Sequence, residues 1–227
     1  MLLPVILAFA FTACSSDNEA SQQPITEQNE LIETGKQFAK IHNDGLDAIY
    51  TALINSKNET ESFSDSSICQ VIENAANSFI RQHNTQTRVT DDSEIDYSVY
   101  EKISIEDIRK NMSPREKQFV QSAISDNQDI EQLLEMVTND TSLSHSKKEA
   151  IICFITTFKA SSEYWSNNYS EWLKLTDKAT TRSFKFDWKQ VAVADAYWTY
   201  TGLLSSGLNV WVGGGAAAVG SVAACLK

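Results

Sequence analysis

The C-terminal part of the chain constrains the fold most, because residues 196–226 carry no charged side chain. This stretch is rich in Gly, Ala, Ser and Val, and its small residues recur at helical spacing. A small side chain lets two helix backbones, or a helix and a membrane, approach each other closely. The predicted packing face contains Gly202, Gly207, Gly213, Ala217, Gly220, Ser221 and Ala224. The sequence therefore predicts either a tightly packed helical element or an element that contacts a membrane.

Three interpretations of the C-terminal segment, residues 183–227, stay open. It could be a helical hairpin that turns at residues 207–209 and closes a bundle. It could span a membrane, because its 31 uncharged residues exceed the roughly 20 that one spanning helix needs. It could also be a latent segment that inserts into a target membrane, as glycine-zipper antibacterial toxins do. In each case a membrane or protein contact would run through residues 190–226.

The packed hairpin is the favoured interpretation of this segment. A carboxylate such as Asp195 is costly to place in hydrocarbon. Three consecutive glycines at residues 213–215 weaken an isolated helix. If the hairpin is packed, Asp195 needs a partner, and we expect a capping amide or a lysine.

Charge and motifs exclude several classes of function. The chain has 19 basic and 30 acidic residues, and its formal net charge of -11 opposes binding to nucleic acid. The sequence contains no phosphate-binding loop, dinucleotide fingerprint, paired-histidine metal motif or serine-nucleophile elbow. We therefore expect no cofactor and no metal, and we assign no catalytic residue.

A short apolar run at residues 2–11 precedes a cysteine near the start of the chain. Its length suits the hydrophobic region of a secretory signal and is too short to span a bilayer. The run leads into Phe11-Thr12-Ala13-Cys14, which resembles the lipobox of bacterial lipoproteins. Phe stands at 11 where Leu is usual, and no Lys or Arg precedes the run. The resemblance implies a signal peptide at residues 1–13 and a fatty acyl group such as palmitate on Cys14.

The residues after the cysteine bear on location. The run Ser-Ser-Asp-Asn-Glu at residues 15–19 resembles the acidic segment of Bacteroidota-type lipoproteins, some of which are displayed at the cell surface. The chain then stays polar to about residue 28, so we expect a flexible tether over residues 14–29. Lipid at Cys14 would hold the protein on a membrane of the bacterial cell envelope. The resemblance implies the outer membrane and surface exposure.

The most distinctive local motif is His42-Asn43-Asp44-Gly45-Leu46-Asp47. Its Asn-Asp-Gly core predicts that one helix ends here and another is capped. His42, Asn43, Gly45 and Asp47 form the candidate site. We expect a buried histidine and capping residues, because metal sites usually show paired ligands and no second histidine lies nearby. The motif also resembles a His-Asn-x-Gly-Leu-Asp segment of uncharacterised Bacteroidota lipoproteins with a Gly/Ala-rich tail, which brings no known activity.

Residues 30–182 are predicted to form a helical domain. Apolar residues at helical spacing predict helices over residues 31–54, interrupted at the motif, and over residues 66–83. The run Ser113-Pro114-Arg115-Glu116 predicts a helix start with a capping box. A further helix over residues 130–137 is expected to be capped by Asp126 or Asn127.

A second capping box at residues 146–149 is predicted to open the longest helix, which ends near residue 175. That helix carries an aromatic-rich row, which at this spacing favours a core face over a ligand groove. The row consists of Ile151, Ile155, Phe158, Ser162, Trp165, Tyr169 and Trp172. A last helix is expected over residues 188–205. The predicted fold is all-α, a helical bundle with a glycine-zipper-like hairpin at its C-terminal end.

Three cysteines remain after Cys14. Cys69 and Cys153 lie inside apolar helical patterns, so each is expected to be a small buried residue. An envelope location would permit a disulfide among them and Cys225, but the spacing does not select a pair.

The sequence supports three functions in order of preference. The first is a lipid-anchored envelope protein with a non-catalytic structural or interaction role. The second is an antibacterial protein that permeabilises membranes through its C-terminal glycine-zipper segment. The third is a carbohydrate-binding or hydrolytic lipoprotein, which would need Trp165, Tyr169 or Trp172 exposed in a cleft beside carboxylates.

Overall fold

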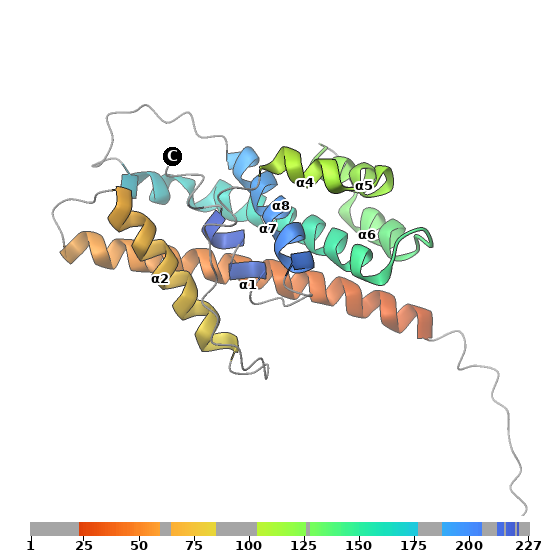
Figure 1. Ribbon diagram of the computed structural model, residues 1–227, viewed down its shortest axis with the longest axis horizontal. Helices are drawn as coiled ribbons and strands as arrows, with labels where there is room; N and C mark the ends of the chain where they lie inside the picture. The colour runs from red at the N-terminus through yellow and green to blue at the C-terminus, as the bar shows by residue number, and fades with distance from the viewer. Residues whose placement is uncertain are drawn as a thin grey trace, which may run out of the picture.

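The protein is an all-α bundle, as predicted (Figure 1). The computed structural model describes residues 23–59, 65–84, 104–125, 128–176, 188–205, 213–215, 217–220 and 222. Within these ranges the regular secondary structure is α-helix and no strand occurs. The predicted signal peptide at 1–13 and Cys14 lie outside the described residues.

Two long helices form the frame of the bundle. Helix α1 (Gln23–Glu59) and helix α7 (His145–Thr176) run side by side in the same direction (Figure 1). Their contacts follow the register Gly35 with Thr156, Asn43 with Ala160, and Lys57 with Lys174. The contact at Gly35 is close, because a Cβ there would lie 2.7 Å from Cγ2 of Ile152.

The remaining helices pack around this frame. Helix α8 (Trp188–Ser205) lies against α7, and helix α2 (Asp65–Asn84) crosses α1 near one end of the molecule (Figure 1). Helices α5 (Pro114–Ile124) and α6 (Ile130–Thr138) pack on α7 towards the opposite end, and helix α4 (Ile105–Asn111) packs on α8. Each of the shorter helices α2, α4, α5 and α6 therefore packs on α1, α7 or α8.

The continuity of α1 corrects two predictions. The helix begins at Gln23, so residues 23–29 of the expected tether are helical. It also runs without a break through Asn43, Asp44 and Gly45, where an interruption was predicted. The reason is tertiary: the residues on either side share one buried face, and burial of that face outweighs the local turn preference. The buried residues of this face include Leu31, Phe38, Ile41, Leu46, Ile49 and Leu53.

The helix caps were predicted in part. At Ser113 the predicted capping box is confirmed, since its hydroxyl accepts from the amide of Glu116 and that carboxylate accepts from the amide of Ser113. Helix α6 is capped by Asp129 instead of Asp126 or Asn127. Helix α7 begins one residue before Ser146, and the Ser144 side chain accepts from a first-turn amide there, so the box predicted at 146–149 is wrong. At 32 residues α7 is also shorter than α1, which has 37.

Most of the aromatic-rich row of α7 belongs to the core, as predicted, whereas Ser162 and Tyr169 are partly exposed. Its members Ile151, Ile155 and Trp165 are fully buried, and Trp172 is 7% exposed. The rings of Trp165 and Trp172 are 5.2 Å apart between centroids, and Tyr50 of α1 packs on Trp172. These tryptophans therefore do not present a ligand-binding surface.

The part of the chain after α8, to which the name C-terminal segment is restricted from here on, is helical at residues 213–215, 217–220 and 222. These residues are buried, except for the partly exposed Gly220. Gly207, Ser221 and Ala224 of the predicted packing face, and the predicted turn at 207–209, lie outside the described residues. None of the described helices is both long enough and apolar enough to cross a membrane.

Candidate functional site

The motif at residues 42–47 lies at the centre of the bundle, where α1 meets α7, α8 and the C-terminal segment. His42 is fully buried. Its Nδ1 lies 3.0 Å from Oδ1 of the neighbouring Asn43, and its Nε2 lies 3.5 Å from Oδ2 of Asp195 in α8. The prediction of a buried histidine is confirmed, but the neighbouring residues do not cap a helix.

Asn43 connects the motif to α7. Its Nδ2 donates a hydrogen bond of 3.3 Å to the carbonyl oxygen of Ala160. Because the amide nitrogen points to that carbonyl, the amide oxygen faces His42. Asn43 therefore both ties α1 to α7 and orients the imidazole ring.

Asp195 is a fully buried carboxylate, and two of its hydrogen-bond donors are side chains that the sequence did not predict. Oδ2 accepts hydrogen bonds from the Ser161 hydroxyl and from Nε1 of Trp165, the latter at 2.9 Å. Both donors come from α7, and neither is the capping amide or lysine that was expected. Hydrogen bonding of this kind lowers the cost of burying a carboxylate. The polar cluster of His42, Asn43, Ser161, Trp165 and Asp195 thus joins three helices.

The other motif residues contact different elements. Gly45 faces the C-terminal segment, where a Cβ at Gly45 would lie 3.3 Å from Cβ of Ala218. Leu46 is fully buried in the core. Asp47 is exposed, and its Oδ1 accepts a hydrogen bond of 2.9 Å from the hydroxyl of Tyr164 in α7. The motif is therefore a packing centre that positions α7, α8 and the C-terminal segment on α1.

The chemistry of the polar cluster does not suit nucleophilic catalysis. A serine nucleophile needs a histidine base within hydrogen-bond reach, whereas Ser161 donates to Asp195. His42, Ser161 and Asp195 are each 0% exposed, so a substrate has no access to them. Among the described residues, no three His, Cys, Asp or Glu side chains are grouped to bind a metal ion.

The glycines of the C-terminal segment pack directly on three helices. A Cβ at Gly213 would lie 3.1 Å from the ring of Phe38, one at Gly214 would lie 2.9 Å from Cγ2 of Ile41, and one at Gly215 would lie 2.4 Å from Cδ1 of Ile80. A Cβ at Gly202 of α8 would meet the backbone of Gly213 at 3.2 Å. Larger side chains at these positions would separate the segment from α1, α2 and α8.

Two more members of the predicted packing face are described. Ala217 is fully buried in a small cluster with Ala194 and Trp198. A Cβ at Gly220 would lie 3.1 Å from the indole of Trp198. The small residues therefore serve helix packing inside the described part of the protein.

A second buried carboxylate, Glu116, has a role that the sequence reveals only in part. Besides closing the capping box of α5, it accepts from the Tyr200 hydroxyl of α8 and lies 2.8 Å from Nζ of Lys147 in α7. Burial would raise its pKa, but the hydrogen bonds from Lys147, Tyr200 and Ser113 outweigh burial and lower the pKa to about 2. Glu116 is therefore ionised at neutral pH and joins three helices.

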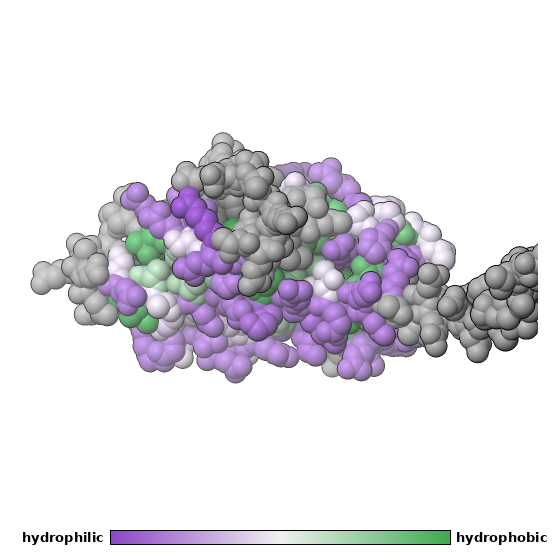
Figure 2. Space-filling model, turned by 90° about the horizontal axis from the view of Figure 1, so that it is seen from below, coloured by the Kyte–Doolittle hydropathy of each residue, from purple (hydrophilic) through white to green (hydrophobic). Residues whose placement is uncertain are grey.

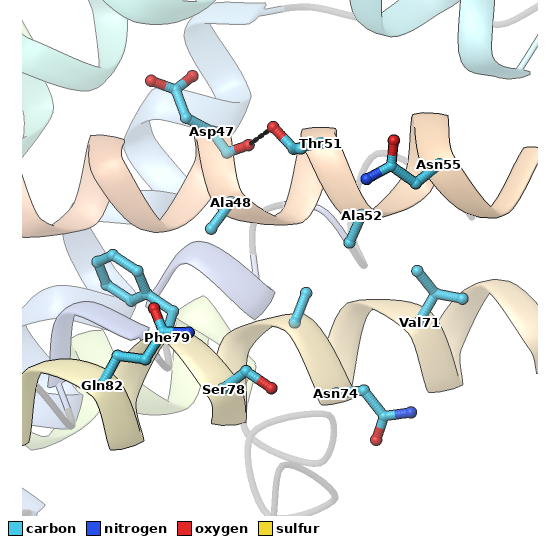
Figure 3. Close-up of a pocket in the computed structure, with 11 residues that line it drawn as sticks. Asp47, Ala48, Thr51, Ala52, Asn55, Val71, Asn74, Ser78, Phe79 and Gln82 are labelled. Atoms are coloured by element: carbon cyan, nitrogen blue, oxygen red, sulfur yellow. Dashed lines mark hydrogen bonds between the residues drawn. The ribbon is translucent and has the colours of Figure 1, made fainter.

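An open groove of about 650 Å³ lies between α1 and α2 (Figure 3). Small apolar side chains that point between the two helices form its floor, and partly exposed Ala75 adds to them. Exposed hydroxyls and amides form the rims. Figure 3 shows the Asp47 carboxylate directed away from α2. The floor includes Ala48, Ala52 and Val71, and the rims include Thr51, Asn55, Asn74, Ser78 and Gln82.

The groove is electrically neutral apart from Asp47, whose carboxylate is bound by Tyr164. Figure 2 shows the face on the α1 side, where hydrophilic residues dominate and apolar residues form small separate patches. A groove with amide rims can form hydrogen bonds as both donor and acceptor, which suits an uncharged polar partner.

Comparisons with known proteins give no relative for this chain: no protein-family model, no curated protein and no solved structure matches it.

Proposed function

We propose that the protein is a lipid-anchored protein of a bacterial cell envelope with a non-catalytic structural or interaction role. The observation that carries this proposal is the burial of the C-terminal glycines against Phe38, Ile41 and Ile80 of the body. A segment that packs inside the body is not free to enter a bilayer. The attachment to a membrane is then assigned to lipid on Cys14, which belongs to the lipobox-like run at residues 11–14.

The non-catalytic part of the proposal follows from the polar cluster. Its ionisable members His42 and Asp195 are fully buried and serve contacts between helices. The groove between α1 and α2 offers the contact surface for a partner, and its neutral, amide-rich rims favour an uncharged polar segment of that partner. We place the protein on the outer membrane with its helical body exposed at the surface.

Metabolic labelling with an alkyne analogue of palmitate tests the anchor. We expect the wild-type protein to be labelled and to fractionate with membranes, and the Cys14→Ser variant to be unlabelled and soluble. Cys153→Ser is the matched control, because Cys153 is fully buried and cannot serve as an acylation site. Label that persists in Cys14→Ser, or a wild-type protein without label, would contradict the proposal.

A second candidate function is permeabilisation of a target membrane by α8 and the C-terminal segment, packed as a glycine-zipper-like hairpin. The observation that favours it is the close contact of Gly202 with Gly213, together with the absence of charge from residues 196–226. Gly and Ala bury little apolar area each, so release of such a segment costs less than release of a leucine-rich one.

An engineered disulfide separates the two functions. The Cβ positions of residues 45 and 218 would be 3.3 Å apart, close to the separation of about 3.8 Å in disulfides. In a Cys14→Ser, Cys69→Ser, Cys225→Ser background, Gly45→Cys with Ala218→Cys should lock the segment to α1. Leakage of liposomes that is lost on oxidation and restored by reduction supports permeabilisation. The absence of leakage in both redox states supports the interaction role alone.

A further inference from the structure

The exposed surface of α1 changes in charge along the helix. Where α2 lies beside it, the exposed residues are Asp47, Thr51 and Asn55, and the hydroxyl of Tyr164 binds the Asp47 carboxylate. In the first half of α1 most exposed residues are charged, namely Glu27, Glu30, Glu33, Lys36 and Lys40. The groove between α1 and α2 therefore lies on the part of α1 that is depleted in charge.

Helix α2 carries an uncharged polar stripe on the same side. Exposed amides and a hydroxyl recur there every four residues, at Gln70, Asn74, Ser78 and Gln82. Residues at this spacing share one face of a helix. Two exposed charged residues of the same span, Glu73 and Arg81, do not line the groove. Both rims of the groove thus lack Lys and Glu, as the centres of protein–protein interfaces do.

The groove suits a second copy of the same chain. Copies of a chain with a formal net charge of -11 repel each other, so they meet at least cost through a face that is depleted in charge. Amides and hydroxyls both donate and accept, so one rim can form hydrogen bonds with another rim of the same composition. The small floor residues Ala48, Ala52 and Ala75 keep the side chains between the helices short.

We propose that the groove between α1 and α2 is the contact surface of a homodimer whose two-fold axis runs along the groove. Such an axis places α1 of each copy opposite α2 of the other copy. Asn55 and Asn74 lie on opposite rims at the same end of the groove (Figure 3). In the dimer, Asn55 of each copy therefore meets Asn74 of the other, and the two floors form the centre of the interface.

The direction of the axis follows from the lipid anchor, so the dimer rests on the proposed function and names the partner for its interaction role. Helix α1 begins at Gln23, and the groove begins at Asp47, about 36 Å further along the helix. Residues 15–22 can extend over about 30 Å at most, so lipid on Cys14 stays towards the start of α1. Two copies in one membrane then present α1 in the same direction, as an axis along the groove requires.

The size of the face predicts a weak dimer. Helix α2 has 20 residues and is about 30 Å long, and two adjacent helices are about 20 Å wide. A face of this size buries about 600 Å² per copy, or about 1,200 Å² in total, which is the lower end of the range for stable interfaces. Anchoring on one membrane offsets this weakness, because it raises the effective concentration of one copy near another.

Sedimentation equilibrium of the lipidated protein, in a detergent whose density the solvent matches, tests the dimer. We expect the mass to rise from one chain to two, with a dissociation constant between about 1 µM and 1 mM. The Asn55→Glu/Asn74→Glu variant should dissociate at least about tenfold more readily, because carboxylates then face each other twice across the axis. Both sites are exposed, and Glu is a better helix former than Asn, so the variant should fold.

A charge swap tests the direction of the axis. In Asn55→Glu/Asn74→Lys each new charge meets the opposite charge of the other copy, so dimerisation should return to the wild-type level or exceed it. Asn29→Glu/Gln37→Glu, at exposed sites of α1 far from the groove, is the matched control and should dimerise like wild type. The proposal is overturned by a wild type that stays monomeric up to about 1 mM. It is equally overturned by a Glu/Glu variant as tight as wild type, or by a Glu/Lys variant no tighter than Glu/Glu.

The dimer and the anchor fail separately. A monomeric protein that carries the palmitate label on Cys14 would remove the dimer and leave the anchor in place. A dimeric protein without the label would remove the anchor and leave the dimer in place.

Discussion

Nζ of Lys147 lies 2.8 Å from Oε1 of Glu116, and this ion pair joins α7 to the N-terminus of α5. Glu116 is 3% exposed and also accepts from the hydroxyl of Tyr200 in α8. Glu116, which closes the capping box of α5, thereby also fixes the positions of α7 and α8. The pair and the polar cluster around His42 are two places where buried polar groups hold α8 against the other helices.

We predict that Glu116→Gln lowers the free energy of unfolding at pH 7 by on the order of 2 kcal/mol, because a buried hydrogen-bonded charge is replaced by a neutral amide beside Lys147. The folded-state pKa of about 2 lies below the usual value of 4.5, so the carboxylate stabilises the fold above about pH 4.5. That stabilisation is lost as pH falls towards 2. Urea unfolding at pH 7 and pH 3 measures the difference.

Glu163→Gln is the matched control for this prediction, because Glu163 is an exposed residue of α7. It should change the unfolding free energy by less than about 0.5 kcal/mol. An equal loss in both variants, or a loss in Glu116→Gln that grows towards pH 3, would contradict the role assigned to Glu116.

The helices were predictable from the sequence, because their signal is local. Apolar spacing located α2 and α8, and Ser113 with Glu116 located the start of α5. The same local rules failed at Asn43 and Gly45, where the chain has turn-forming residues inside a continuous helix. Packing of Gly45 on Ala218 occurs across more than 170 residues, and a local window cannot weigh it.

The sequence pointed to His42 and Asn43 as candidate residues and to Asp195 as a carboxylate that needs a partner, but not to the cluster that they form. His42 was expected to be buried, yet Asp195, Ser161 and Trp165 come from two other helices and are brought to it only by the fold. The sequence did indicate that Asp195 has a buried partner, because this carboxylate lies in an apolar helix. The identity of that partner depends on helix register, which the sequence did not specify.

Cys153 is predicted to be unreactive in the native protein. Its thiol is fully buried, and burial together with the nearby charge of Glu149 raises its pKa far above the usual value of 9.0. The thiolate is the reactive form, so a thiol reagent such as DTNB should not modify it. In a Cys14→Ser, Cys69→Ser, Cys225→Ser variant, we expect no DTNB reaction before urea is added and one thiol afterwards. Rapid reaction of the native variant would show that α7 opens locally.

Tyr164 links the motif to the aromatic core, and Tyr164→Phe should cost about 1 kcal/mol of stability. Its hydroxyl donates to Asp47 and accepts from Nε1 of Trp172 at 3.3 Å, so the substitution removes two hydrogen bonds. Tyr50→Phe is the control, because Tyr50 contacts Trp172 through its ring. Urea unfolding followed by tryptophan fluorescence measures both. A larger loss for Tyr50→Phe would contradict the assignment.

Gly215→Ala should destabilise the protein by about 1–3 kcal/mol, because the added methyl group would overlap the side chain of Ile80. The new Cβ would lie 2.4 Å from Cδ1 and 2.6 Å from Cγ1 of Ile80, so that side chain or the C-terminal segment must move. Ile80→Ala alone removes those atoms and should cost about 2–5 kcal/mol through the cavity it leaves.

The double variant distinguishes local overlap from a general effect on the chain. With both substitutions the methyl group added at position 215 occupies space that the Ile80 side chain vacated, so the two losses should be less than additive. A coupling of at least about 1 kcal/mol in urea unfolding would place residue 215 against α2 in solution. Strict additivity would mean that the C-terminal segment does not rest on Ile80, and the burial on which the envelope proposal depends would then be lost.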